Sequence, residues 1–191
     1  LSRWLMEAEG NAVGREIRRA MEICVDNANL AIFNSANANP AYAGMGTTLV
    51  LAVFRDGRLT VGHIGDSRCY RIRGAVMDQV TKDHSLLQEQ IDAGMITLEQ
   101  AAVSPIKNLV TRALGVEQSV MLEVNEFQVM PGDVYLMCSD GLSDMVEDEV
   151  IARIVGEGSE LSQIAESLVT AANNNGGKDN ISVLMVAASE A

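Results

Sequence analysis

The stretch VYLMCSDGLSD, residues 134–144, ends an apolar run with two carboxylates placed around a glycine. Residues 134–137 are types that suit a buried strand, and Asp140 and Asp144 follow shortly after it. Aspartate is common at turns because its side chain accepts hydrogen bonds from nearby backbone amides. Asp144, three residues before Glu147, is also placed to cap a helix. A cation site is the alternative, and it requires other acidic turns at the same place.

Two other turns carry an aspartate in a matching position. Asp66 follows an apolar run that ends at Ile64, and Asp179 precedes the apolar run 181–187. If the last two strands are antiparallel neighbours, Asp140 and Asp179 lie at one edge of a sheet. Clustered carboxylates repel each other unless a cation neutralises them, and such all-oxygen sites suit Mg²⁺ or Mn²⁺. Each aspartate alone favours a simple turn role; the matching placement of the three weakens that interpretation, but the pattern alone does not name a reaction.

The strand pattern predicts an α+β fold. Asp56-Gly57 is a two-residue hairpin signal between the apolar runs 47–54 and 58–64. Later strands are expected at 68–73, 120–129, 134–139 and 181–187, with a bulge in the second of these, where the alternation changes phase. Several runs are apolar at consecutive positions, which requires cover on both faces. Two stacked antiparallel sheets with helices outside, in four layers, satisfy both observations.

Helices are expected at both ends of the chain and between the late strands. The first spans 11–36, and two shorter ones lie near 150–155 and 161–172. Its predicted buried stripe consists of residues at three- and four-residue spacing: Val13, Ile17, Ala20, Cys24, Ala28 and Ala31. Residues 84–104 are helical but more polar, so we interpret them as a mobile flap.

Composition limits the class of protein. The chain has 191 residues, 48% of them hydrophobic, with a formal charge of −12. This suits one domain and disfavours a nucleic-acid partner. No apolar stretch approaches the roughly 20 residues of a membrane span. The three cysteines are unclustered, as expected of buried thiols in a cytoplasmic protein, and no membrane association is expected.

Other catalytic classes lack their signatures. There is no G-x-S-x-G elbow, and no cysteine is followed six residues later by an arginine. His63 lies inside a predicted strand and is expected to be packed. His84 precedes a predicted helix, where a helix-start or surface role is favoured.

Six motifs, in order, resemble those of bacterial type 2C protein phosphatases, the metal-dependent serine/threonine phosphatases. The resemblance covers about residues 44–187 and rests on GMGTTLV (44–50), HIGDSRCYRIR (63–73), TKDHS (81–85), LVTRALG (109–115), PGDVYLMCSDGLSD (131–144) and GGKDNISV (176–183). That family's fold is an α-β-β-α sandwich, in agreement with the four layers predicted above.

The resemblance implies a role for each aspartate. Asp140 and Asp179 match ligands of a binuclear Mn²⁺ or Mg²⁺ centre and are the implied catalytic residues, and Asp66 matches a ligand of a third metal. Residues 81–108 correspond to the flap. The implied reaction is hydrolysis of phosphoserine or phosphothreonine on signalling proteins by a metal-bound hydroxide. A cognate serine/threonine kinase would supply those phosphoproteins.

The family's N-E-D and D-G-M-G-G motifs and its upstream arginine are not found in this sequence. We therefore expect residues 1–191 to form a single domain that is N-terminally incomplete, with N-terminal strands missing and activity impaired. Open sheet edges would favour a homo-oligomer. Two alternatives remain: a regulatory phosphatase of the stage II sporulation E type, and a catalytically dead binding module.

Overall fold

The computed structural model describes residues 13–102, 104, 109–158 and 160–189. Its internal contacts divide the chain into two compact units. The first unit comprises residues 1–65 and 84–128, and the second comprises 66–83 and 129–191. The prediction of one domain over 1–191 stays a prediction.

The first unit contains a three-stranded antiparallel sheet in the order β1-β2-β5. Strand β1 (Leu49–Arg55) and strand β2 (Arg58–Ile64) form the predicted hairpin, with Leu49 opposite Ile64. Asp56 and Gly57 both have positive φ, at 50° and 69°, as the tight hairpin turn requires. The hairpin and its turn are confirmed.

Strand β5 (Glu123–Gln128) is shorter than the predicted 120–129 strand. It pairs with β2 in unbroken register, from Arg58 opposite Gln128 to His63 opposite Glu123, so the predicted bulge is wrong. Val124 and Phe127 lie an odd number of positions apart and therefore face opposite sides of a regular strand. The change of phase in the apolar pattern arises because both faces of β5 are partly covered.

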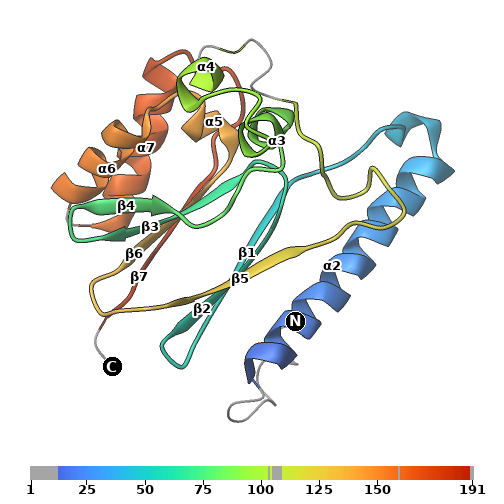
Figure 1. Ribbon diagram of the computed structural model, residues 1–191, viewed down its shortest axis with the longest axis horizontal. Helices are drawn as coiled ribbons and strands as arrows, with labels where there is room; N and C mark the ends of the chain where they lie inside the picture. The colour runs from blue at the N-terminus through green and yellow to red at the C-terminus, as the bar shows by residue number, and fades with distance from the viewer. Residues whose placement is uncertain (1–12, 103, 105–108, 159, 190–191) are drawn as a thin grey trace. The chain divides into compact units, whose positions relative to one another are not determined.

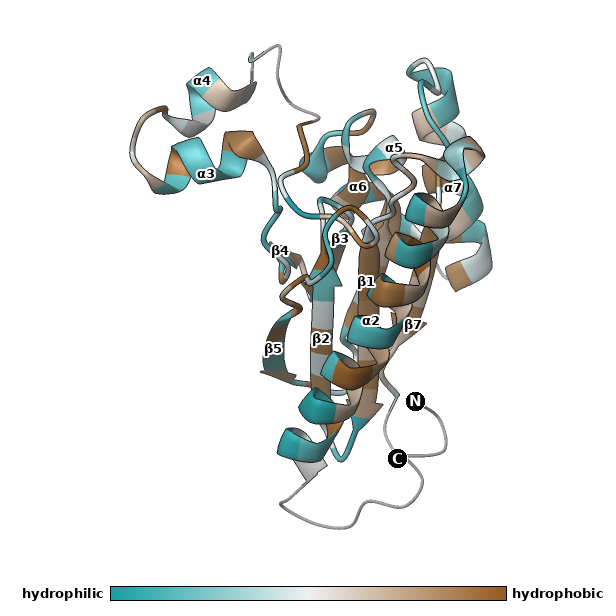
Figure 2. Cartoon of the chain, turned by 90° about the vertical axis from the view of Figure 1, so that its right-hand side faces the viewer, coloured by the Kyte–Doolittle hydropathy of each residue, from teal (hydrophilic) through white to brown (hydrophobic). Residues whose placement is uncertain are grey.

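The first helix, α2, spans Val13–Ala38, close to the predicted range. Figure 2 shows it running along the sheet of this unit. The predicted stripe is only partly right, because Cys24 is half-buried while Ala28 and Ala31 are exposed. The buried positions are Ile17, Ala20, Met21, Val25 and Asn29. Larger side chains at four-residue spacing fill the space over the sheet, which a stripe of small residues would leave open.

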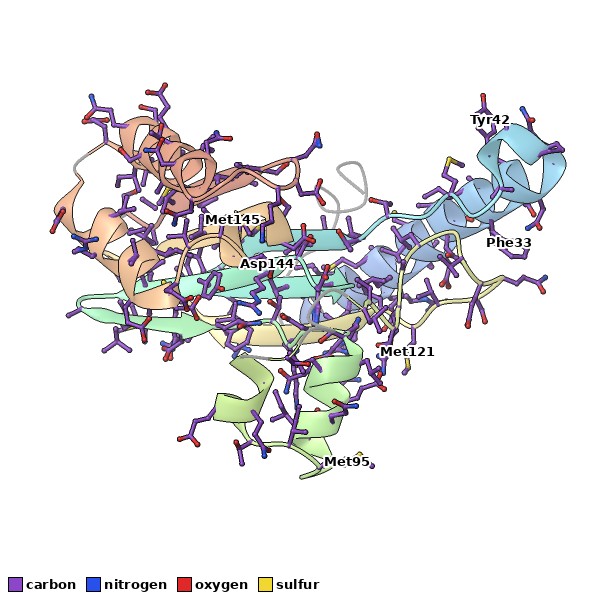
Figure 3. All side chains as sticks on the ribbon, turned by 90° about the horizontal axis from the view of Figure 1, so that it is seen from above. Phe33, Tyr42, Met95, Met121, Asp144 and Met145 are labelled. Carbon is purple, nitrogen blue, oxygen red and sulfur yellow. The ribbon has the colours of Figure 1, made fainter. Side chains whose placement is uncertain are left out.

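The expected helical segment 84–104 contains two short helices. They are α3 (Leu86–Asp92) and α4 (Leu98–Ala102), and the 3₁₀ helix η2 (Pro40–Tyr42) completes the first unit's helical elements among the described residues. Met95, between α3 and α4, is 74% exposed (Figure 3). The flap over 81–108 stays a prediction, and residues 103 and 105–108 lie outside the described residues.

The second unit contains a four-stranded antiparallel sheet in the order β4-β3-β6-β7. Its strands are β3 (Arg68–Arg73), β4 (Val76–Gln79), β6 (Val134–Cys138) and β7 (Val183–Ala187). Strand β4 was not expected from the sequence, because four residues give too short an alternation to recognise. The last two strands are antiparallel neighbours, as predicted, with Cys138 opposite Val183.

Helices α5 (Asp140–Ser143), α6 (Asp148–Glu157) and α7 (Leu161–Asn174) belong to the same unit. Figure 1 shows α6 and α7 side by side against the sheet. Their buried residues, including Ile151, Val155 and Leu168, form one apolar cluster with Tyr70 and Leu136 of the sheet. This cluster anchors β3 and β6, whose ends carry the carboxylates described next.

Two smaller findings concern the expectations from composition. Cys24, Cys69 and Cys138 are free thiols, and the last two are buried. Among the described residues, no helix combines the length and the apolar character needed to cross a membrane.

Candidate metal centre

The pairing of β3 with β6 places two of the predicted aspartates at the same end of one sheet. Arg68, the first residue of β3, lies opposite Cys138, the last residue of β6. Asp66 precedes the one strand by two residues, and Asp140 follows the other by two residues. Antiparallel pairing therefore brings together carboxylates that are far apart in the sequence.

The electrostatics of Asp66 show that the carboxylates lie close together. Burial, and next the negative charge of Asp140, raise the pKa of Asp66 to about 6 from an ordinary value of 3.8. Asp83 and Asp144 raise the pKa further, while a hydrogen bond with the backbone lowers it. The principal charged neighbours of Asp66 are thus other carboxylates, an arrangement that a bound cation would stabilise.

Among these carboxylates, Asp83 forms an ion pair with an arginine. The Nε and Nη2 groups of Arg68 both donate to the Asp83 carboxylate, at distances of 2.7–3.1 Å. The Nη1 group of Arg68 donates to the Tyr70 hydroxyl, which donates in turn to Asp148. Asp83 is therefore part of a structural network, and Asp66 and Asp140 are better placed to hold a cation.

Asp144 does not cap the helix that the sequence suggested. Helix α6 begins at Asp148 with Glu147 as its N-cap residue, whereas Asp144 is the C-cap residue of α5. Figure 3 shows Asp144 beside Met145 at the end of this short helix. One turn of helix between Asp140 and Asp144 keeps both residues close to Asp66, since positions four apart lie on one face. The i, i+4 spacing of the two aspartates was the signal for this role in the sequence.

Asp179 reaches the same end of β6 through backbone contacts. The Ser139 hydroxyl donates to the Asn180 carbonyl and accepts from the Ser182 amide, at 3.1 and 3.0 Å. A Cβ atom on Gly141 would lie 2.3 Å from the Asn180 carbonyl oxygen, so only glycine permits this approach. The Asp179 carboxylate accepts from the Asn180 amide at 2.6 Å, and Asp179 is not among the principal contributors to the Asp66 pKa.

The donor set at this end of the sheet consists of carboxylate oxygens. Asp66, Asp140 and Asp144 supply them from one electrostatic cluster, and the Asp179 segment is fixed alongside. Hard divalent cations prefer such ligands, and Mg²⁺ takes one or two carboxylates and fills its remaining positions with water. The residues present therefore fit Mg²⁺ or Mn²⁺.

A second polar cluster lies in the first unit. His63, His84 and Glu123, here called the His–Glu cluster, place one nitrogen or oxygen ligand atom each within 4.8 Å of one another. His63 is fully buried, as expected, but the surface role considered for His84 is wrong, because that side chain is also buried. The N-cap of α3 is Ser85, whose hydroxyl accepts from the Gln88 amide. Sequence reasoning missed this cluster because its members come from three separate segments.

Comparison with known proteins gives consistent results. Residues 2–180 match the protein phosphatase 2C family. The chain is 38% identical over 171 residues to a serine/threonine phosphatase, stp, of Listeria innocua, covering 90% of this chain and 68% of that protein.

Two solved structures are also similar. The S. agalactiae serine/threonine phosphatase superposes with a TM-score of 0.86 at 32% identity, covering 92% of this chain and 72% of that one. The catalytic domain of the phosphatase PstP, solved in complex with two manganese ions, has a TM-score of 0.84 at 33% identity, covering 99% of this chain and 77% of that one.

Proposed function

Because the chain belongs to the protein phosphatase 2C family, we propose that it hydrolyses phosphoserine and phosphothreonine esters on proteins with the help of Mn²⁺ or Mg²⁺. The observation that carries the proposal is the cluster of carboxylates around Asp66, where burial and the negative charge of Asp140 raise the pKa of Asp66. Membership of this family confirms the resemblance inferred from the six motifs. The similarity to solved phosphatases confirms the α+β class with two antiparallel sheets.

In this proposal each aspartate has a positional role. Asp140 and Asp179 hold the cations used in the reaction, and Asp66 holds a further one together with Asp140 and Asp144. When bound, the cations supply a Lewis acid for the phosphoryl oxygens and lower the pKa of water. The chain's own contribution is to hold the oxygens in place, through Ser139, Gly141 and the β3–β6 pairing. The substrate follows from the family, and a cognate kinase would supply it.

We also propose that these 191 residues alone are impaired. The acidic N-E-D and D-G-M-G-G motifs of the family do not occur in this sequence, and the chain spans 68% of the Listeria relative. A centre with fewer carboxylates binds cations more weakly. Cation binding should therefore persist while turnover is low.

The test combines cation binding with hydrolysis. Thermal unfolding is followed with Mn²⁺ and with EDTA, and hydrolysis of p-nitrophenyl phosphate and a phosphothreonine peptide is measured under both conditions. The chain is assayed alone and with any coding sequence upstream of Leu1. Asp140→Asn should abolish most of the Mn²⁺-dependent stabilisation. Asp78→Asn is the matched control, because Asp78 lies on the same sheet but pairs with Arg71.

Each outcome has a distinct meaning. Hydrolysis that requires Mn²⁺ and is lost in Asp140→Asn supports the proposal. Binding of Mn²⁺ without hydrolysis in either version overturns the catalytic function and favours a binding module. Equal stabilisation of both variants would assign Asp140 to a turn role.

A further inference from the structure

The His–Glu cluster is a largely buried polar feature that the proposed reaction does not use. The rings of His63 and His84 stack with centroids 4.6 Å apart and an interplanar angle of 20°. The Glu123 carboxylate lies 3.2 Å from Nε2 of His84, and its side chain is 37% exposed. Two histidines and a carboxylate also form common transition-metal sites. The hydrogen bonds decide whether this cluster is such a site or a hydrogen-bonded group without a metal.

Hydrogen bonds at His84 argue against a metal. The Gly65 amide donates to Nδ1 of His84 at 3.2 Å, so Nδ1 carries a lone pair and the neutral ring keeps its proton on Nε2. That proton points at the Glu123 carboxylate. A metal on Nε2 would require the proton on Nδ1, where the Gly65 amide already points. Glu123 therefore selects a tautomer rather than completing a metal site.

Gly65 and His84 are joined by two hydrogen bonds. Besides the bond to Nδ1, the His84 amide donates to the Gly65 carbonyl at 2.9 Å. The His84 carbonyl accepts from the Thr111 amide at 2.8 Å, which fixes this segment from its other side. Gly65 has a φ of +100°, and a Cβ atom there would lie 2.4 Å from Cγ2 of Thr48. The backbone at Gly65 thus adopts a conformation that favours glycine, and the two hydrogen bonds with His84 hold it there.

Gly65 immediately precedes Asp66 in the chain. We propose that His84, as the Nε2–H tautomer selected by Glu123, is a positioning residue that fixes the Gly65 backbone and thereby the direction in which Asp66 enters the carboxylate cluster. The inference rests on the proposed role of Asp66 as a cation ligand. His84 itself contacts neither cation nor substrate in this scheme.

Protonation of His84 should break its hydrogen bond with the Gly65 amide, an effect that a residue which only fills space would not show. A charged imidazolium carries a proton on both nitrogens, so Nδ1 could no longer accept from Gly65. Burial lowers the pKa of His84, and the nearby His63 on β2 and Arg112 lower it further, while the hydrogen bond with Glu123 on β5 opposes them. The neutral form therefore persists at neutral pH, and the Gly65 bond breaks only on acidification.

Two substitutions test the roles of Nδ1 and Nε2 of His84 separately. The side-chain oxygen of asparagine lies the same number of bonds from the backbone as Nδ1, so His84→Asn keeps an acceptor for Gly65 and cannot titrate. The side-chain amide of glutamine reaches the place of Nε2, so His84→Gln keeps a donor to Glu123 and loses that acceptor. The readouts are amide hydrogen exchange at Gly65, the ¹⁵N shifts of the His84 ring, and Mn²⁺ affinity by calorimetry.

We expect His84→Gln to accelerate Gly65 exchange and weaken Mn²⁺ binding, each by about tenfold, the worth of one such hydrogen bond. His84→Asn should stay within about twofold of the unmodified chain in both. In the unmodified chain, acidification should protonate His84 and release the Gly65 amide together, and His84→Asn should show no such transition. The acid transition of the unmodified chain requires no substitution, so it can be measured even if His84→Gln does not fold.

Three results would overturn the inference. Unchanged Gly65 exchange in His84→Gln would show that the hydrogen bond to Nδ1 of His84 does not hold the Gly65 amide. Faster exchange with unchanged Mn²⁺ affinity would show that His84 holds Gly65 without positioning Asp66, and would leave the proposed function intact. Absence of Mn²⁺ binding by the unmodified chain, with the exchange pattern as expected, would locate the failure in the proposed function, and the inference would fall with it.

Discussion

The two ends of the β3–β6 pair contain aspartates with opposite properties. At one end, burial and neighbouring carboxylates raise the pKa of Asp66 to about 6. At the other end, Arg73 holds the pKa of the fully buried Asp133 at about 2. Asp133 accepts from Nε and Nη2 of Arg73 at 2.6 and 2.7 Å, and from the Met130 amide and the Tyr135 hydroxyl.

This difference separates a structural carboxylate from a ligand-binding one. The charge of Asp133 is compensated within the chain, so Asp133 stabilises the fold without a ligand. At the Asp66 end, burial and neighbouring carboxylates disfavour the ionised form of Asp66, a free-energy cost that a bound cation would relieve. The following predictions test this contrast, in order of decreasing effect.

The largest effect is expected from Asp133→Asn. The amide has one acceptor oxygen, and its NH₂ group would face donors that now point at a carboxylate. We expect a loss of roughly 2 kcal/mol in the free energy of unfolding, because Asp133 is fully buried while its partner Arg73 is 43% exposed and can turn to solvent. Urea denaturation with EDTA measures it. The Mn²⁺-dependent stabilisation should be unchanged, and a free energy of unfolding equal to that of the unmodified chain would contradict the structural role.

The pH dependence of stability should differ in sign between the two ends. Asp66 has a raised pKa, so its contribution is fully present below its ordinary pKa of 3.8 and is lost as the pH rises through about 6. Asp133 has a lowered pKa, so its contribution is present above pH 3.8 and is lost as the pH falls toward about 2. Without metal, stability should fall by on the order of 1 kcal/mol between about pH 4 and pH 7 because of Asp66.

Asp66→Asn is the control for this profile. The variant should lose the decline above about pH 4 in EDTA and keep the acid transition of Asp133. Mn²⁺ should reverse the slope in the unmodified chain, because the cation competes with the proton for Asp66. An identical decline in Asp66→Asn would show that another group titrates.

The smallest effect is expected from Asp78→Asn. Nη2 of Arg71 donates to Asp78 at 2.7 Å, as short a bond as those at Asp133, but the Asp78 side chain is 47% exposed. Solvent compensates its loss, so the free energy of unfolding should change by less than about 0.5 kcal/mol. A loss comparable to that of Asp133→Asn in the same denaturation assay would show that burial of the aspartate does not determine how much each arginine–aspartate pair stabilises the fold.

Much of the fold could be predicted because the signals are local. The Asp56-Gly57 turn, the apolar strands and the helix over 161–172 depend on residues near one another in sequence. The helix cap considered for Asp144 was wrong and the stripe predicted for α2 was only partly right, for a shared reason. Both depend on which surface packs against the element, and the residues that form this surface lie elsewhere in the chain.

The sequence by itself determined that aspartates stand at the turns beside the strands, and that glycines allow the chain to bend there. Only the tertiary structure decided which of these aspartates lies among other carboxylates and which pairs with an arginine. Asp66 and Asp133 are both turn aspartates next to a strand, yet pairing of β3 with β6 places one among carboxylates and the other against Arg73. The physical reason is that the pKa of a carboxyl group depends on burial and on charges within a few ångströms, and folding alone sets those distances.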